Sequence, residues 1–180
     1  MNTKWHNLRQ RCNYLLVWIK RAARSRGFGV QSPTDYWIVR YVINEHWPYY
    51  QYDTIGCGDP WLRRKLGKLY FRLANWRQPA VVTTDDYQDY FLAGCRKAAI
   101  GKQGQLVRLT LDDGWQTRLN EFLDRANQQS VLVVEGIADN KEAWQQIVDD
   151  QRTGVTFDLY YCGLAMFDKK RIKKNYIINF

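Results

Sequence analysis

The chain has 180 residues, 46% of them hydrophobic and 25% charged, with a formal net charge of +9 at pH 7. This length predicts one domain with a sizeable core and an N-terminal extension. The four cysteines stand singly in the sequence, which argues against a disulfide framework and against a zinc site. No stretch approaches transmembrane length and none has the pattern of a signal peptide, so we expect a cytoplasmic protein.

The positive charge is concentrated in the first part of the chain. Residues 1–77 hold 14 Lys and Arg against 4 Asp and Glu, whereas residues 78–180 hold 13 against 14. A basic segment of this kind favours a polyanion or a protein as partner, or an anionic membrane surface. A solvated basic face without a specific partner explains the same charges. The pattern predicts no particular oligomeric state.

A first helix is predicted from Lys4 to about Ser25, because apolar residues recur on one helical stripe and Gly27 and Gly29 follow it. The stripe consists of Trp5, Leu8, Cys12, Leu15, Leu16, Ile19, Ala22 and Ala23. Such a helix either packs on its own domain or lies on a membrane or a partner, and the sequence leaves both possibilities open.

Two further helices are predicted before residue 79. Ser32 followed by Pro33 is a good N-cap with proline in the first turn, and the helix should run to about His46. The next helix should begin at Asp59 and Pro60 and continue through Trp76. Both predictions rest on capping residues followed by apolar residues at helical spacing.

The turn before the third helix contains Gly56 and Gly58 in the run Ile-Gly-Cys-Gly-Asp. A Gly-x-Gly turn after an apolar residue is the shape of a loop that lets the backbone approach a nucleotide-like cofactor. An ordinary helix-entry turn capped by Asp59 explains the same residues. A helix-entry turn is the favoured interpretation, and Gly56 and Gly58 are an alternative candidate for the cofactor loop.

Alternating strands and helices are predicted from residue 79 onwards. The first strand is Ala80 to Thr84, followed by a helix capped near Asp85 or Asp86, and a second strand runs from Gln105 to Leu111. The unbroken apolar run Val131 to Val134 predicts a central parallel strand that helices bury on both faces.

The last part of the chain predicts one more helix and an antiparallel pair of strands. Asp139 with Glu142 three residues later is a capping-box pattern. Two β-rich runs then meet at Cys162 and Gly163, which indicates a tight turn or bulge between them. The fold class is therefore α/β: a Rossmann-like three-layer sandwich with a mostly parallel sheet, an antiparallel C-terminal hairpin edge and a helical N-terminal extension. Residues 1–78 form a basic helical segment packed on a core of residues 79–180.

The end of the chain resembles the C-terminus of a bacterial branch of class I S-adenosylmethionine-dependent methyltransferases. The residues concerned are Val155-Thr-Phe-Asp-Leu-Tyr-Tyr-Cys-Gly-Leu-Ala-Met-Phe and Tyr176-Ile-Ile-Asn-Phe. Two earlier stretches are similar to elements of the same branch: Gly27-Phe-Gly-Val-Gln-Ser-Pro33 and Lys68-Leu-Tyr-Phe-Arg-Leu-Ala-Asn-Trp-Arg-Gln-Pro79. The resemblance covers both ends of the chain and is thin in the middle, where the family keeps its cofactor motifs.

The resemblance implies that the cofactor loop follows the first strand, so Thr84 and Asp85 are candidate cofactor-binding residues. In this chain the turn from Thr83 to Asp89 contains no glycine. Side chains where a cofactor needs bare backbone, and carboxylates facing its carboxylate, oppose ordinary S-adenosylmethionine binding. The chain is also short by at least one strand and helix of the family pattern.

Glu135 is the third candidate, because it stands at the carboxyl end of the central strand, where open α/β sheets place functional groups. The family has an Asp-Asp pair at this point. We expect Glu135 instead to be held by a helix N-terminus or a basic side chain, and we expect no metal site. The leading hypothesis is a methyltransferase-like pseudoenzyme that uses no cofactor and acts by binding a partner. The alternative is an active methyltransferase that binds S-adenosylmethionine in an atypical pocket.

Overall fold

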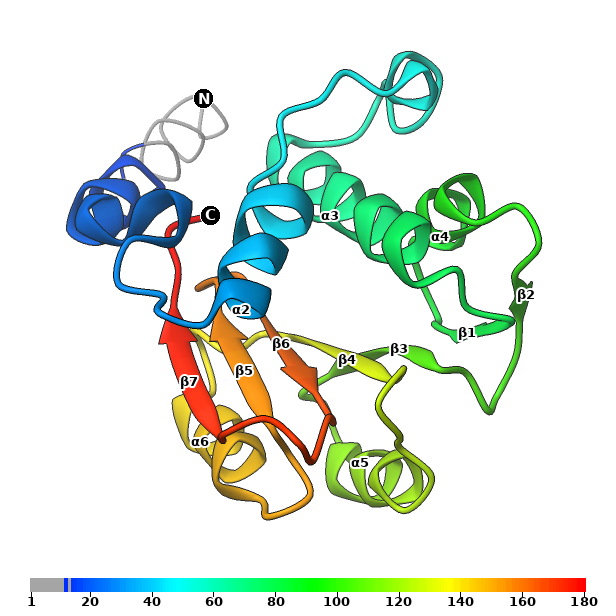
Figure 1. Cartoon of the computed structure of the whole chain (residues 1–180). Coiled ribbons are helices and arrows are strands. Elements are labelled where there is room, and N and C mark those ends of the chain that lie inside the picture. Colours follow the sequence, from blue (N-terminus) through cyan, green and yellow to red (C-terminus); the bar gives the residue numbers. More distant parts are fainter. Residues whose placement is uncertain (1–11, 13) are drawn as a thin grey trace.

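A seven-stranded sheet in the order β2-β1-β3-β4-β6-β5-β7 organises the computed structural model, which describes residue 12 and residues 14–180 (Figure 1). The described strands are β1 (Val81–Thr83), β2 (Ala99–Ile100), β3 (Leu106–Thr110), β4 (Val131–Glu135), β5 (Val155–Asp158), β6 (Cys162–Met166) and β7 (Lys174–Ile177). Strand β6 runs antiparallel to both of its neighbours, and the other pairs are parallel.

Strand β4 lies in the centre of the sheet and confirms the prediction made from its unbroken apolar run. Its first four residues are each 0% exposed. The side chains of Leu132 and Val134 pack in one hydrophobic cluster, and those of Val131 and Val133 pack in the other, so helices bury both faces of the strand. The α/β class with a mostly parallel sheet is thus confirmed, and β7 lies outside the antiparallel β5–β6 pair as the outermost strand.

Helices cover both faces of the sheet, as Figure 1 shows. The upper layer consists of α2 (Pro33–Ile38), the π-helix η2 (Val39–Ile43), α3 (Trp61–Arg77) and α4 (Gln88–Gly94). The lower layer consists of α5 (Trp115–Leu123) and α6 (Lys141–Asp149). Two short 3-10 helices, η1 (Ala22–Gly27) and η3 (Tyr50–Asp53), lie in the N-terminal part.

Helices α2, η2 and α3 share one hydrophobic core with the sheet. Ile38, Leu69 and Leu73 are buried in the same cluster as Val133 and Phe157. Burial of such side chains contributes about 1.5–3 kcal/mol each, so these helices are held on the sheet by the hydrophobic effect. The domain boundary between residues 78 and 79 stays a prediction.

The predicted cap was right for α2 and wrong for α6. Ser32 caps α2, because its hydroxyl accepts a hydrogen bond from the Asp35 backbone at 3.3 Å. The cap of α6 is Asn140 and not Asp139, since the Asn140 side chain accepts from the Ala143 backbone at 3.0 Å. The helix therefore begins one residue later than the pattern predicted, and the side chain at the N-cap accepts from the backbone three residues on.

The predicted caps of α3 and α4 were also wrong. Helix α3 begins after Pro60 without a side-chain cap, because the carboxylate of Asp59 accepts a hydrogen bond from Tyr90 instead. Tyr87, and not Asp85 or Asp86, precedes α4 and makes no side-chain capping bond. In both cases the expected carboxylate forms a contact with a residue that is distant in sequence.

The helical segment that begins at Pro33 ends at Ile43, three residues earlier than predicted. Arg72 of α3 explains the early end. Its guanidinium donates to the carbonyls of Val42 at 2.6 Å and Ile43 at 2.8 Å. Backbone carbonyls at the end of a helix need such partners, and here a side chain supplies them in place of another helical turn.

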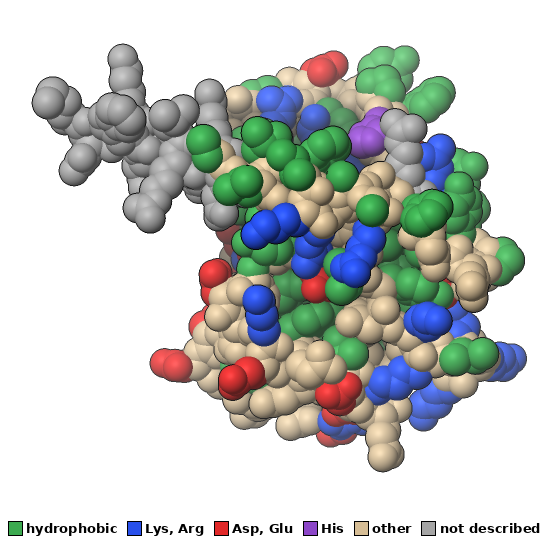
Figure 2. Space-filling view, turned by 90° about the vertical axis from the view of Figure 1, so that its left-hand side faces the viewer, with side chains coloured by type: hydrophobic (Ala, Val, Ile, Leu, Met, Phe, Trp, Pro, Cys, Tyr) green, Lys and Arg blue, Asp and Glu red, His purple; other side chains and the backbone are tan. Residues whose placement is uncertain are grey.

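The N-terminal helix packs on the domain, but not through the predicted stripe. Residues 14–21 are helical, and the Tyr14 ring lies 4.6 Å from the ring of Trp61. Leu15, Leu16 and Ile19 are instead 54–58% exposed. Figure 2 shows hydrophobic side chains gathered in the upper half of the face that it draws. Trp5 and Leu8 of the predicted stripe lie outside the described residues.

The described residues contain no helix that is both long and apolar enough to cross a bilayer. All four cysteines are free, with Cys12 and Cys57 exposed and Cys95 and Cys162 buried. In this part of the chain, no group of three or more His, Cys, Asp or Glu side chains is placed to hold a metal ion.

Candidate functional site

The carboxyl edge of β1 and β3 is the first candidate site. From β1 the chain crosses through α4 to β2, and from β3 it crosses through α5 to β4 on the other side. Ligands of open α/β sheets bind where the connections that leave two neighbouring strands lead to opposite sides in this way. Thr84 and Asp85 follow β1, and Glu135 ends β4, so the structure places all three predicted site residues at this edge.

Arg108 of β3 joins two of these residues. Its guanidinium holds Glu135 in a two-bond pair, with the Nε to Oε1 distance at 2.7 Å and the Nη2 to Oε2 distance at 2.9 Å. Its Nη1 also donates to Asp85. The Arg108 side chain is only 6% exposed. Glu135 is therefore held by a basic side chain, which is one of the two outcomes we expected.

Tyr70 of α3 adds a further hydrogen bond to Glu135. Burial, together with the nearby Cys162 and Glu135, raises the pKa of Tyr70 well above its usual value. The hydroxyl consequently keeps its proton and acts as a donor. With Arg108 and Tyr70 in place, the Glu135 carboxylate is satisfied by groups of the protein itself.

A second ion pair lies beside the first. Arg63 of α3 binds Asp86 through two hydrogen bonds of 2.6 and 2.8 Å, and its Nε lies 3.3 Å from Asp59. The hydrogen bonds from Arg63 lower the pKa of Asp86 to about 2. The guanidiniums of Arg63 and Arg108 lie 4.3 and 5.2 Å from the centroid of the Tyr87 ring.

The turn after β1 therefore offers charged side chains in place of bare backbone. The Thr84 hydroxyl donates a hydrogen bond to the Asp86 carbonyl, so its proton is engaged within the turn. Tyr87 follows in the left-handed region, with a φ of 59°. An incoming carboxylate or phosphate would meet Asp85 and Asp86 here, and like charges disfavour binding.

A hollow of about 660 Å³ opens from this edge towards α5. It exists because the chain passes from β2 to β3 through residues 101–105 without a helix, which leaves the sheet beside α5 uncovered. The carboxyl edge contributes Thr83, Thr84, Asp85, Arg108 and Thr110 to its lining, and the apolar walls are Val107, Leu109, Phe122 and Leu132.

The alternative loop at Gly56 and Gly58 lies in the turn between η3 and α3. Gly56 has a φ of +64°, and a Cβ at this position would overlap the hydroxyl of Tyr90. That hydroxyl donates to Asp59 at 2.8 Å. The space beside Gly56 is thus filled by protein, and the loop connects to the turn after β1 through Arg63, which pairs with both Asp59 and Asp86.

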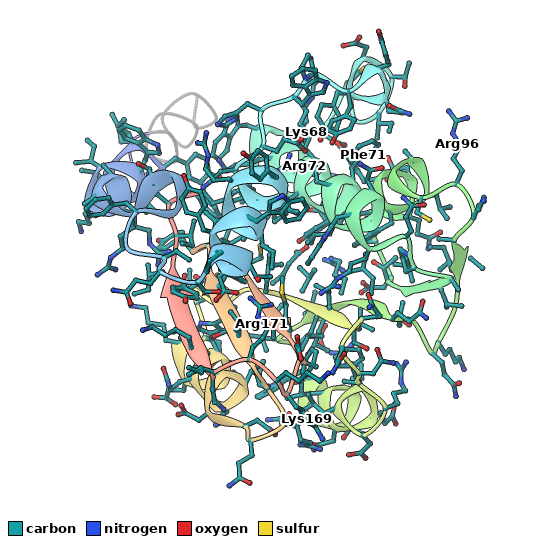
Figure 3. All side chains as sticks on the ribbon, in the orientation of Figure 1. Lys68, Phe71, Arg72, Arg96, Lys169 and Arg171 are labelled. Carbon is teal, nitrogen blue, oxygen red and sulfur yellow. The ribbon has the colours of Figure 1, made fainter. Side chains whose placement is uncertain are left out.

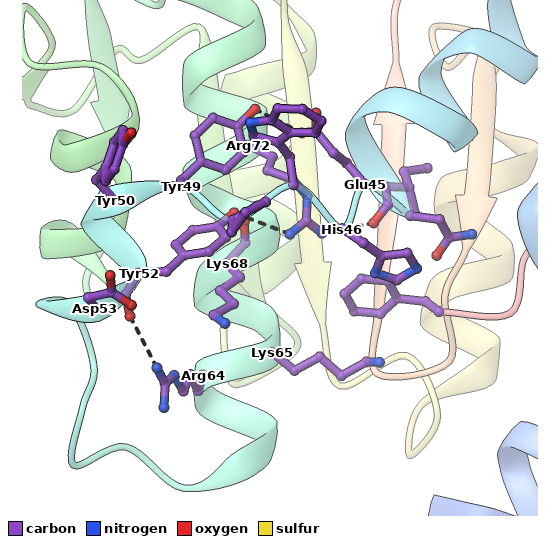
Figure 4. Close-up of a pocket in the computed structure, with 15 residues that line it drawn as sticks. Glu45, His46, Tyr49, Tyr50, Tyr52, Asp53, Arg64, Lys65, Lys68 and Arg72 are labelled. Atoms are coloured by element: carbon purple, nitrogen blue, oxygen red, sulfur yellow. Dashed lines mark hydrogen bonds between the residues drawn. The ribbon is translucent and has the colours of Figure 1, made fainter.

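The second candidate site is a cavity of about 730 Å³ between α3 and residues 43–53, which we call the basic pocket (Figure 4). Its cations are Arg64, Lys65, Lys68 and Arg72. These positions lie on one side of α3, because residues four apart on a helix are neighbours. The remaining lining residues are Ile43, Asn44, Glu45, His46, Trp47, Pro48, Tyr49, Tyr50, Tyr52, Asp53 and Phe180.

The cations of the basic pocket contact carbonyls and rings. Arg64 donates to the Tyr52 carbonyl at 3.1 Å, and the Lys68 ammonium lies 4.6 Å from the Tyr52 ring centroid. Lys65 lies 4.4 Å from the ring centroid of Phe180. Among the described residues, none of the four cations forms an ion pair with a carboxylate.

Burial and crowding of like charges change the acidity of two of these lysines. Burial, followed by the charge of Arg72, lowers the pKa of Lys65 to about 8. Burial and the nearby Arg64 and Arg72 lower the pKa of Lys68. The basic pocket thus concentrates positive charge that is partly removed from water.

Sequence reasoning missed Arg108 and the basic pocket, although each had a signal. Arg108 interrupts an otherwise apolar strand, and a charge at such a position needs a partner nearby. The spacing of the cations in α3 shows that they share a face, but only the folded chain shows which segment closes the pocket. No family model, curated protein or solved structure matches the chain, so both sites are assessed from their own geometry.

Proposed function

We propose that the protein is a methyltransferase-like α/β protein that does not transfer methyl groups and acts by binding an anionic partner through its basic N-terminal half. The observation that carries this proposal is the network of Asp85, Arg108 and Glu135 at the carboxyl edge of the sheet. Its side chains occupy the place where the resemblance implies a cofactor loop of bare backbone.

The network opposes S-adenosylmethionine for two physical reasons. The cofactor ends in a carboxylate, and the turn after β1 presents Asp85 and Asp86 to it. Arg108, which has the charge to bind that carboxylate, is already engaged by Glu135. Releasing the arginine would break a largely buried ion pair, which costs about 3–5 kcal/mol.

Calorimetric titration of the full chain with S-adenosylmethionine and S-adenosylhomocysteine tests the absence of a cofactor. We expect no heat of binding at micromolar concentrations of either compound. A thermal melt of the same sample checks that the protein is folded. A dissociation constant in the micromolar range for either compound would overturn the proposal.

The second candidate function is an active methyltransferase with an atypical pocket, and the hollow beside α5 favours it. Its volume of about 660 Å³ is typical of small-molecule sites, and its walls are apolar. If S-adenosylmethionine binds, Leu109→Trp should abolish binding by filling the hollow. Gln103→Ala, at the rim of the hollow, should retain most of the affinity.

The anionic partner is tested by elution from a heparin column in a salt gradient. Replacing Lys20 and Arg24 by glutamine should lower the salt concentration at elution, because binding to a polyanion depends on cations that displace counterions. Replacing Lys169 and Lys170 by glutamine removes the same charge from the C-terminal part and should change elution much less. Equal shifts in the two variants would contradict an N-terminal binding surface.

A further inference from the structure

The basic pocket gathers four cations, and none of them forms an ion pair with a carboxylate among the described residues. Arg63, Arg108, Arg118 and Arg152 each pair with at least one Asp or Glu. Two carboxylates, Glu45 and Asp53, also line the pocket, but neither forms an ion pair with its cations, and Glu45 accepts a hydrogen bond from Tyr49 at 2.9 Å. A cation withdrawn from water without a counter-charge is unfavourable, and an anionic ligand would relieve this cost.

The pocket also has hydrogen-bond donors that lack a partner or make only a long contact. The Nε of Arg64 is buried and has no hydrogen-bond partner. Arg72 is anchored through its Nε and Nη2, while its Nη1 makes only a 3.4 Å contact with the Tyr52 hydroxyl. Buried donors are almost always satisfied in native structures, so an unpaired donor on a residue that lines the cavity favours a ligand with oxygen acceptors.

Aromatic side chains give the pocket a rigid wall and an open rim. Tyr49, Tyr52 and Phe71 pack against one another with ring centroids 4.9–5.3 Å apart. At the rim, Trp47 is 70% exposed and Tyr50 is 91% exposed. In Figure 4, Lys68 and Arg72 lie beside Tyr52, with Arg64 and Lys65 projecting to either side. Exposed aromatic faces next to a phosphate-binding group are suited to stacking on a planar ring.

We infer that the basic pocket binds a small phosphorylated molecule that carries a planar ring, of the nucleoside phosphate class. Arg64 and Lys68 bind its phosphate, and Trp47 or Tyr50 stacks on its ring. The inference rests on the anionic partner of the proposed function and names its chemical class. A cavity of about 730 Å³ is the size of a small-molecule site, whereas nucleic acids and membranes are bound along extended surfaces.

Titration of the full chain with three compounds tests the ligand class. The compounds are a nucleoside diphosphate, ribose 5-phosphate and inorganic phosphate. We expect affinity to fall in that order, because ribose 5-phosphate lacks the planar base and one phosphate of the nucleoside diphosphate, and inorganic phosphate also lacks the sugar. Equal affinity for the nucleoside diphosphate and inorganic phosphate would overturn the stacking role. Absence of binding by all three would overturn the whole inference.

Two variants test the location of the site. Arg64→Gln and Lys68→Gln should each weaken binding of the nucleoside diphosphate by about tenfold or more, since hydrogen bonds to charged groups are lost. Lys169→Gln is the control, because it removes one charge on the opposite side of the molecule from Lys68 (Figure 3). Equal weakening by the control would show a general effect of net charge and contradict a site in the pocket.

Two further measurements keep the result interpretable. Lys68→Arg retains the charge and should keep most of the affinity, which separates loss of the contact from loss of the fold. Trp47→Ala and Tyr50→Ala together should weaken the nucleoside diphosphate but not ribose 5-phosphate. If a single-stranded oligonucleotide or phosphatidylserine vesicles bind and the nucleoside diphosphate does not, this inference fails while the proposed anionic partner stands.

Discussion

The carboxyl edge of the sheet and the basic pocket use the same kinds of side chain in opposite ways. At the edge, Arg63 and Arg108 are matched by carboxylates within hydrogen-bonding distance. In the basic pocket, Arg64 and Lys68 face a cavity without a carboxylate partner among the described residues. Positive charge alone therefore does not mark a binding site. Whether the protein has already neutralised that charge is the more informative property.

Removal of Arg108 is the strongest test of whether the ion pairs at the carboxyl edge stabilise the fold. Arg108→Met should lower the free energy of unfolding by about 3 kcal/mol or more, because it leaves the largely buried Glu135 without its cation. Urea denaturation at neutral pH measures the loss. Arg118→Gln is the matched control, since Arg118 is 45% exposed and pairs with an exposed aspartate. A similar small loss in both variants would show that the edge network is not structural.

Glu135→Gln tests the same network from the acidic side and should have a smaller effect. The amide keeps an oxygen acceptor for Tyr70 or Arg108 but loses the charge, so we expect stability to fall by about 1–2 kcal/mol. The melting temperature and urea denaturation measure this. An unchanged stability, together with loss of binding of a small ligand, would show that Glu135 serves a ligand and that the edge resembles the basic pocket after all.

The pKa of Lys65 allows the basic pocket to be tested through the pH dependence of ligand binding. A bound phosphate favours protonated Lys65, whose pKa in the free protein is about 8. The affinity for a nucleoside diphosphate should therefore be several-fold higher at about pH 7 than at about pH 9.5, where most of the lysine is neutral. The phosphate itself titrates near pH 6, so its charge is constant over this range.

Lys65→Arg is the control for this pH dependence, because arginine stays charged and should remove most of it. Cys162 and Tyr49 keep their protons in this range, because burial raises the pKa of Cys162 well above its usual value and that of Tyr49 to about 12, whereas burial lowers the pKa of Lys68. The further charged or titratable groups of the pocket are Glu45, His46, Tyr50, Tyr52, Asp53, Arg64, Lys68 and Arg72. An unaltered pH profile in Lys65→Arg would assign the dependence to one of them.

The smallest expected effect concerns Asp86 in acid. Its pKa is about 2 in the folded protein and about 3.8 without its partners. Stability from the pair with Arg63 is thus present above about pH 4 and is lost as the pH falls through about 2. Asp86 is 44% exposed, so the contribution is modest. Melting curves of Arg63→Gln and the unaltered protein should converge between about pH 4 and pH 2, and a constant difference would contradict the assignment.

Local sequence patterns predicted the sheet better than the site. Val131 to Val134 form an apolar run, and a fully buried strand is the simplest structure that satisfies it. Ser32 and Pro33 likewise carry their capping signal within three residues. Asp139 was wrong because the helix begins one residue later, where Asn140 is an equally suitable N-cap, and spacing alone does not separate the two.

The site could not be predicted to the same extent, because it depends on contacts between distant residues. Glu135 was placed at the correct edge of the sheet, but its partner Arg108 lies 27 residues away in sequence. The basic pocket needs residues 43–53 to fold over one side of α3. The exposure of Leu15 and Leu16 also has a tertiary cause, since Tyr14 is the residue that packs on Trp61.

The position of β6 has a consequence for how the chain assembles. Strand β5 pairs only with β6 and β7 in the described sheet, and both follow it in the sequence. While the polypeptide is being synthesised, Val155 and Phe157 therefore emerge from the ribosome before either partner strand exists. β6 follows β5 after the turn at residues 159–161, so the two strands can pair as a local hairpin that docks on β4 through β6. The pairing of β4 with β6 joins residues that are distant in sequence and is the slower, non-local step, so we expect the hairpin to add to the sheet only after β6 has been released.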